Sequence, residues 1–244
     1  MTEKGRDLQS KYTPDRLKTE FTETEQVIFN RRSVRLFKKE QVPEFMIKRI
    51  LEAGRFAPSA GNCQPWKFVV LRDQALIEDV TKTVVGFTKL FKFFLEYRRP
   101  GFFWLRPSAK VSIRIRHNDL APAPFGAISL IADGKLVLWH NAPTVILIFK
   151  DKRGVSNPDL DAGIAGQNMV LAAHSMGLGT CWVGFAKLAF DYHYKWTRYF
   201  GIKYPYKFAN SIAIGWPNGE PDGIIERPTH AVDWYENGTT KTIY

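Results

Sequence analysis

The strongest constraint on the fold is one short segment that has no polar alternation. Residues 144–149 read TVILIF, and such a continuous apolar run is typical of a strand covered on both faces. Three further short strands are predicted, at residues 66–71, 180–185 and 211–214. Helical patterns separate these strands, so the sequence predicts a mixed α/β or α+β sheet covered by helices.

The helices are predicted from their end signals. Residues 22–25 have the spacing of a capping box, and a second helix begins at Pro43 and stops before Pro58. Asp161 is expected to cap a long third helix, which Gly177 closes with a left-handed turn. Residues 86–134 break this alternation. We expect them to form an insertion or lid within a single domain that spans residues 1–244.

Composition excludes several classes of protein. The chain has 244 residues, of which 45% are hydrophobic, and its only cysteines are Cys63 and Cys181. Isolated cysteines give no support to a zinc, iron–sulfur or c-type haem site, so no metal is expected. They also fit a reducing compartment. Residues 1–20 lack the apolar core of a secretory signal, and no apolar run reaches membrane-spanning length. We therefore expect a cytoplasmic protein.

The net charge of +11 is concentrated in residues 82–116. This stretch contains one acidic residue, Glu96, and nine basic residues: Lys82, Lys89, Lys92, Arg98, Arg99, Arg106, Lys110, Arg114 and Arg116. Aromatic residues interleave with them, which suits single-stranded nucleic acid or an anionic membrane surface. The alternative is a lid whose aromatic side chains fill a core while the cations stay in water. We favour the lid and expect no nucleic-acid partner, with membrane contact through residues 87–116 left as an alternative.

Three polar segments are candidates for chemistry. Residues 31–35, RRSVR, cluster three guanidinium groups and a hydroxyl, a set that can hold a phosphate. Residues 58–66, PSAGNCQPW, combine amide side chains with a backbone restricted by proline, and residues 177–184, GLGTCWVG, expose backbone N–H groups. The competing interpretations are a solvated basic turn for the first segment and an elaborate turn that leads into a strand for the second.

Other catalytic patterns are missing from the sequence. Gly177 and Gly179 are followed by Trp182 where a dinucleotide fingerprint requires glycine, and no phosphate loop, GxSxG elbow or HExxH motif occurs. The five histidines are scattered along the chain. Cys181 lies in an apolar strand, where an inert buried thiol is the expected state.

The ordered set of motifs resembles the nitroreductase family of FMN-dependent oxidoreductases. The resemblance rests on RRSVRLF at 31–37, APSAGNCQPW at 57–66, DAGIAGQNM at 161–169, GLGTCW at 177–182 and IAIGWP at 212–217. It implies a three-layer α+β fold with a central, mostly antiparallel mixed sheet. It also implies an intertwined homodimer that holds one FMN in each of two interface pockets.

The resemblance further implies roles for individual residues. The phosphate and ribityl chain would be held by Arg31, Arg32, Ser33 and Arg35, with Arg227 as a further basic ligand. The residues expected to contact the flavin are Pro58, Ser59, Asn62, Gln64, Cys181, Trp182 and Gly184.

The expected activity is hydride transfer from NADH or NADPH, through flavin N5, to a small aromatic, quinone or nitro-type acceptor. No side chain is expected to be an obligatory acid or base, because the cofactor supplies the chemistry. Relatives with the same fold carry out reductive dehalogenation or break down the flavin, and the sequence leaves both alternatives open.

Overall fold

The computed structural model describes residues 21–95, 104, 107, 111, 114, 122–155, 157–219 and 231–242. The side chains of residues 94, 95 and 122–125 are not included. The chain divides into two compact units. One unit comprises Met1–Arg32 with Asp222–Tyr244, and the other comprises Ser33–Pro221.

Among its described residues, the smaller unit contains one helix and one hairpin. Helix α3 spans Glu23–Asn30, and the predicted capping box is confirmed: the Thr22 N–H donates to the Glu25 carboxylate over 2.9 Å, and the Glu25 N–H donates to the Thr22 hydroxyl over 3.3 Å. Strands β5 (Asp233–Glu236) and β6 (Thr239–Thr242) pair antiparallel. Both turn residues, Asn237 and Gly238, have positive φ, as tight hairpin turns require.

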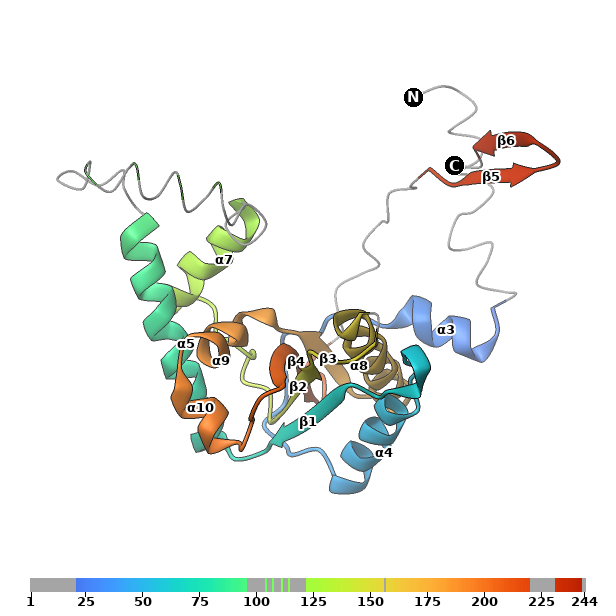
Figure 1. Cartoon of the computed structure of the whole chain (residues 1–244). Coiled ribbons are helices and arrows are strands. Elements are labelled where there is room, and N and C mark those ends of the chain that lie inside the picture. The colour runs from blue at the N-terminus through green and yellow to red at the C-terminus, as the bar shows by residue number, and fades with distance from the viewer. Residues whose placement is uncertain are drawn as a thin grey trace. The chain divides into compact units, whose positions relative to one another are not determined.

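A four-stranded antiparallel sheet forms the centre of the larger unit, in the order β1-β2-β4-β3 (Figure 1). Its strands are β1 (Trp66–Leu71), β2 (Thr144–Asp151), β3 (Gly179–Trp182) and β4 (Tyr206–Gly215). Strand β2 pairs on both edges and is covered on both faces, which explains its unbroken apolar run. The expected end of β3 at residue 185 is wrong, because the 3₁₀ turn η3 (Gly184–Ala186) follows Val183.

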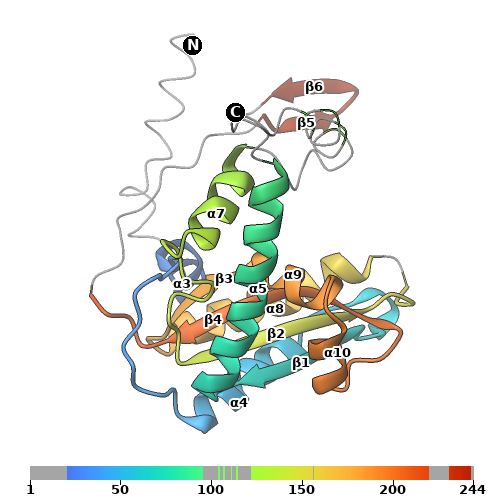
Figure 2. The same ribbon diagram turned by 90° about the vertical axis from the view of Figure 1, so that its left-hand side faces the viewer.

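Helices cover both faces of this sheet (Figures 1 and 2). On one face α4 (Glu44–Arg55) and α8 (Pro158–Ser175) pack against Ile146 and Ile148. On the other face α5 (Gln74–Leu95), α9 (Lys187–Asp191) and α10 (Tyr194–Tyr199) pack against Val145, Leu147 and Phe149. Helix α7 (Pro122–Ala132) runs beside α5. Alternate side chains of β2 therefore enter two cores, and the expected three-layer α+β fold is confirmed.

Helix α8 begins earlier than expected. Its first residue is Pro158, and Asn157 caps it by accepting hydrogen bonds from the N–H groups of Asp159 and Leu160, each over 3.2 Å. Asp161 lies inside the helix and is buried, so its expected capping role is wrong. The predicted end is confirmed: Gly177 has a φ of +79°, and the Leu178 N–H reaches back to the Ala173 carbonyl over 3.0 Å.

Helix α5 has no counterpart among the predicted elements. It begins after Asp73, whose carboxylate accepts a hydrogen bond from the Ala75 N–H over 2.9 Å. Lys92, near its end, pairs with Asp133 over 2.6 Å. No helix within the described ranges combines the length and apolar character needed to cross a bilayer. Most of the basic stretch beyond residue 95 lies outside the described residues, so its predicted roles stay untested.

Candidate functional site

The segment Ser33–Arg35 runs alongside β3. Ser33 forms an isolated parallel bridge with Thr180, and the Val34 N–H donates to the Thr180 carbonyl over 2.9 Å. A Cβ at Gly179 would lie 2.8 Å from Val34 Cβ, so glycine there permits this close approach. Val34 packs against the core, whereas Ser33 and Arg35 are exposed on either side of it in the sequence.

Arg35 gives this surface a positive charge. Within the described part of the chain, its exposed guanidinium has no carboxylate partner. Partial burial lowers the pKa of His140 below its ordinary value, and the Arg35 charge lowers this pKa further. A hydroxyl and a guanidinium are both hydrogen-bond donors of the kind that bind phosphate, and Ser33 and Arg35 expose them two residues apart in the sequence.

Strand β3 leads from this segment to Gly184. The Cys181 side chain is buried in the core beside α5, as the sequence predicted for an inert thiol, and the Trp182 indole lies over Gly166 of α8 on the opposite face. The backbones of Cys181 and Trp182 both lie in the antiparallel pairing of β3 with β4. Gly184 is exposed, and its N–H has no acceptor among the described residues. At about 3.3 Å per residue, Gly184 lies roughly 13 Å along the chain from Thr180.

The loop from Pro58 to Gln64 forms a second polar group. Its backbone has positive φ at Gly61, Asn62 and Gln64, which are +58°, +54° and +47°. Two of these residues are not glycine, and such conformations cost free energy unless their surroundings maintain them. The Ser59 hydroxyl accepts from the Gln64 N–H over 2.9 Å, and the Gln64 amide donates to Asn62 Oδ1 over 3.0 Å.

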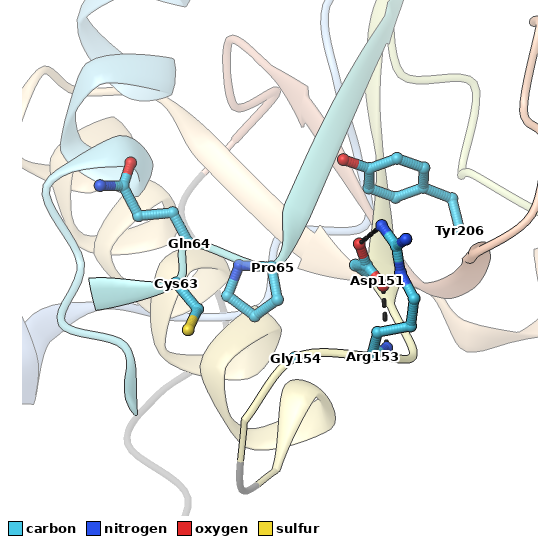
Figure 3. Close-up of a pocket in the computed structure, with 7 residues that line it drawn as sticks. All are labelled: Cys63, Gln64, Pro65, Asp151, Arg153, Gly154 and Tyr206. Atoms are coloured by element: carbon cyan, nitrogen blue, oxygen red, sulfur yellow. Dashed lines mark hydrogen bonds and ion pairs between the residues drawn. The ribbon is translucent and has the colours of Figure 1, made fainter. Parts of the chain in front are cut away.

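A cavity of about 370 Å³ lies beside the end of this loop (Figure 3). Its lining residues are Cys63, Gln64, Pro65, Asp151, Arg153, Gly154 and Tyr206. The Arg153 guanidinium donates two hydrogen bonds to the Asp151 carboxylate, of 2.9 and 3.1 Å, and these bonds hold the pKa of that carboxyl below its ordinary value. Because these charges satisfy each other, the cavity is poorly suited to a phosphate.

The 151–154 turn instead supports the loop. The Asp151 N–H donates to the Pro65 carbonyl over 2.8 Å. A Cβ at Gly154 would lie 2.7 Å from Pro65 Cβ, so the two segments are in close contact. Sequence reasoning did not find Asp151, Arg153, Tyr206 or His140, because no motif connects positions so far apart in the chain.

The expected site residues therefore fall into separate groups. Ser33 and Arg35 both lie exposed beside β3, but within the described ranges no hydrogen bond or ion pair joins them to the 58–64 loop. Arg31 and Arg32 belong to the smaller unit. There the Arg32 guanidinium donates through Nη1 to the carbonyls of Phe29 and Arg31. Arg227 lies outside the described residues.

Comparisons with known proteins point to one family. A protein provisionally named NADH dehydrogenase/NAD(P)H nitroreductase from Archaeoglobus fulgidus is 27% identical over 158 residues, 65% of this chain, and the chain spans only 65% of that relative's length. The 5,6-dimethylbenzimidazole synthase of Rhodospirillum rubrum is 27% identical over 207 residues, covering 81% of this chain and 83% of that protein.

A solved structure shares the fold. The FMN-bound nitroreductase of Desulfitobacterium hafniense DCB-2 superposes with a TM-score of 0.63 at 23% identity, covering 86% of this chain and 98% of that one. The family model described as "Nitroreductase family" matches residues 28–216, well over half of the sequence. This chain therefore belongs to the nitroreductase family.

Proposed function

We propose that this protein is an FMN-dependent oxidoreductase that uses NADH or NADPH to reduce a small aromatic, quinone or nitro-type acceptor. Bound FMN would supply the redox chemistry, accepting a hydride at N5 and passing reducing equivalents to the acceptor. The observation that carries the proposal is a pair of exposed groups near the two ends of strand β3, which is itself largely buried: the Arg35 guanidinium near one end, and at the other the Gly184 N–H, which has no acceptor among the described residues. This arrangement fits an elongated ligand with an anionic end and a planar end.

The anionic end of FMN would be held by Ser33 and Arg35. Both side chains are exposed, and the Arg35 charge already disfavours protonation of His140 nearby. A phosphate would satisfy the guanidinium in bidentate fashion and relieve this repulsion. By resemblance, Arg31, Arg32 and Arg227 would add further cationic contacts.

The planar end of FMN would meet the backbone at Gly184. This residue is exposed where β3 gives way to η3, and it carries no side chain that would keep a ring at a distance. The side chains of Cys181 and Trp182 point into the cores, so we propose that they contribute only through backbone position. An N–H donor near a developing negative charge would stabilise the reduced ring.

We propose that a second copy of the chain completes the site with Pro58, Ser59, Asn62 and Gln64. Helix α8 offers a contact for a homodimer, because it carries an apolar side chain on its outer surface as well as on its buried side. One side is buried through residues such as Ala165 and Met169, while Leu160 on the outer surface is 60% exposed.

The phosphate assignment is tested by the double variant Ser33→Ala/Arg35→Ala. Loss of charge-assisted hydrogen bonds worth about 1.5–3 kcal/mol predicts FMN binding weakened roughly tenfold to a hundredfold. Arg198→Ala is the matched control, because it removes another exposed arginine, from α10. FMN fluorescence titrations measure both. Equal FMN affinity in the double variant and in the control would contradict the assignment.

The acceptor is tested by turnover of FMN-loaded protein with NADH and with NADPH. A nitroaromatic, a quinone and a halogenated phenol are supplied separately, and we expect reduction of the first two. The similarity to 5,6-dimethylbenzimidazole synthase favours one alternative, in which FMN itself is consumed. Loss of FMN with appearance of 5,6-dimethylbenzimidazole would select that alternative.

A further inference from the structure

A buried hydrogen-bond relay ends at the peptide unit between Val183 and Gly184. The Trp139 indole N–H donates to the Ser211 hydroxyl over 2.9 Å, and that hydroxyl donates to the Val183 carbonyl over 2.5 Å. Ser211 is fully buried and Trp139 is 1% exposed. The Val183 N–H in turn donates to the Ser211 carbonyl over 2.8 Å, so Ser211 holds both polar groups of Val183.

This relay determines which way the next N–H points. A trans peptide unit is planar, and its C=O and N–H bonds point in opposite directions. The Val183 carbonyl is directed at buried Ser211, so the Gly184 N–H of the same peptide unit is directed away from the core. Gly184 is indeed exposed, and within the described residues this N–H meets no acceptor.

The relay also strengthens the donor. A hydroxyl that accepts a hydrogen bond becomes a better donor, because bonds in a chain polarise one another. The bond accepted by the Val183 carbonyl then withdraws electron density from its amide and makes the Gly184 N–H more acidic. The 2.5 Å separation between Ser211 Oγ and the Val183 oxygen lies at the short end of the range for such hydrogen bonds.

We propose that Ser211 and Trp139 are positioning residues, which orient and polarise the Gly184 N–H as the hydrogen-bond donor to the ring of bound FMN. This inference rests on the function proposed above and deepens it. Neither side chain touches the ligand, and both act through the Val183–Gly184 peptide unit.

The sequence permits a direct measurement of that peptide unit. Only two valines precede a glycine, in Val85–Gly86 and Val183–Gly184. Protein with carbonyl-¹³C valine and ¹⁵N glycine therefore shows two cross-peaks in a carbonyl-correlated amide NMR spectrum. Gly86 lies inside α5 with open space around it, so Gly86→Ala removes its peak and identifies that of Gly184.

The relay itself is tested without FMN. In Ser211→Ala the Val183 carbonyl loses its side-chain donor, so we expect the Gly184 cross-peak to move while the Gly86 peak stays in place. Trp139→Phe should move the Gly184 peak less and in the same direction. The matched control is Thr88→Val, which removes another fully buried hydroxyl, one that donates to the Val85 carbonyl in α5. Thr88→Val should leave the Gly184 peak unmoved.

The role toward FMN is tested by titration. In the wild type, FMN should shift the Gly184 peak and leave the Gly86 peak in place. Ser211→Ala should bind FMN more weakly, by up to about tenfold, which corresponds to loss of the whole Gly184 hydrogen bond, and should shift the flavin absorption band. Thr88→Val should retain wild-type FMN affinity even if it lowers the melting temperature equally.

Two results would overturn the inference. One is a Gly184 peak that Ser211→Ala or Trp139→Phe leaves at its wild-type position. The other is a wild type that binds FMN without any shift of that peak. A wild type that does not bind FMN contradicts the proposed function instead, and the FMN-free spectra still decide whether the relay exists.

Discussion

Gly166 should not tolerate even one added methyl group. This residue lies in α8 under the Trp182 indole, and a Cβ there would overlap the ring, lying 2.8 Å from its Cζ2 and 2.9 Å from Ile148 Cδ1. The indole is a rigid ring on a paired strand, so relieving the overlap requires the side chain to rotate out of its packed position or β3 to shift. Overpacking of this kind costs about 1–3 kcal/mol.

The net effect of Gly166→Ala follows from two opposing terms. Alanine is favoured over glycine in a helix by up to about 1 kcal/mol, which offsets part of the strain. We therefore expect a net loss of roughly 1–2 kcal/mol in the free energy of unfolding. For a chain of this size, that loss lowers the melting temperature by about 2–8 °C.

Thermal denaturation followed by circular dichroism measures this loss. The control is Gly86→Ala, the same substitution in an exposed helical position where a Cβ meets nothing within 4 Å. That variant should be as stable as the wild type or more stable, by up to about 1 kcal/mol. If Gly166→Ala melts at or above the temperature of Gly86→Ala, the packing of Trp182 on α8 is not as described.

Three further predictions concern the site and its surroundings. Burial lowers the pKa of His140 in the folded state, so on acidification the unfolded chain binds a proton at this histidine before the folded chain does. The midpoint of urea unfolding should therefore fall as the pH drops below about 6.5, the pKa of histidine in the unfolded chain, and His140→Gln should reduce this pH dependence. Gly179→Ala places a Cβ 2.8 Å from Val34 Cβ and should displace Ser33 and weaken FMN binding, and an unchanged dissociation constant would argue against the phosphate assignment. Leu160→Glu replaces the exposed apolar side chain on α8 with a charge and should convert the proposed homodimer to monomers in sedimentation velocity, whereas an intact dimer would exclude Leu160 from the interface.

Elements with local signals were predicted well. The capping box at Thr22 and the left-handed turn at Gly177 each depend on residues only a few positions apart, and both are confirmed. Strand β1 matches its predicted bounds at Trp66 and Leu71. The run at 144–149 became the doubly paired β2, because only a strand with no exposed edge or face is apolar throughout.

Element ends were less predictable where two local signals compete. Asp161 and Asn157 are both good capping residues, and the choice of Asn157 depends on Pro158, which favours the first helical position. Asp73 precedes α5 and could have indicated its start through the same capping chemistry. The early end of β3 has no comparable signal at Val183.

The site was predictable only in part. The sequence placed Ser33 and Arg35 in a phosphate-binding cluster, and the structure brings both to an exposed surface beside β3. The relay through Trp139 and Ser211 joins residues 72 positions apart, and no local pattern relates them. Ser211 reaches Val183 only when the sheet places β4 beside the end of β3, and Trp139 belongs to neither of these strands.

The flavin content of the purified protein is the most direct test of the proposed function. The protein is incubated with excess FMN, freed of unbound cofactor by gel filtration and examined by visible absorption, with protein concentration measured on the same sample. We predict a yellow protein that retains one FMN for each chain. A colourless protein that retains none, although its melting curve shows it to be folded, would contradict the proposed function.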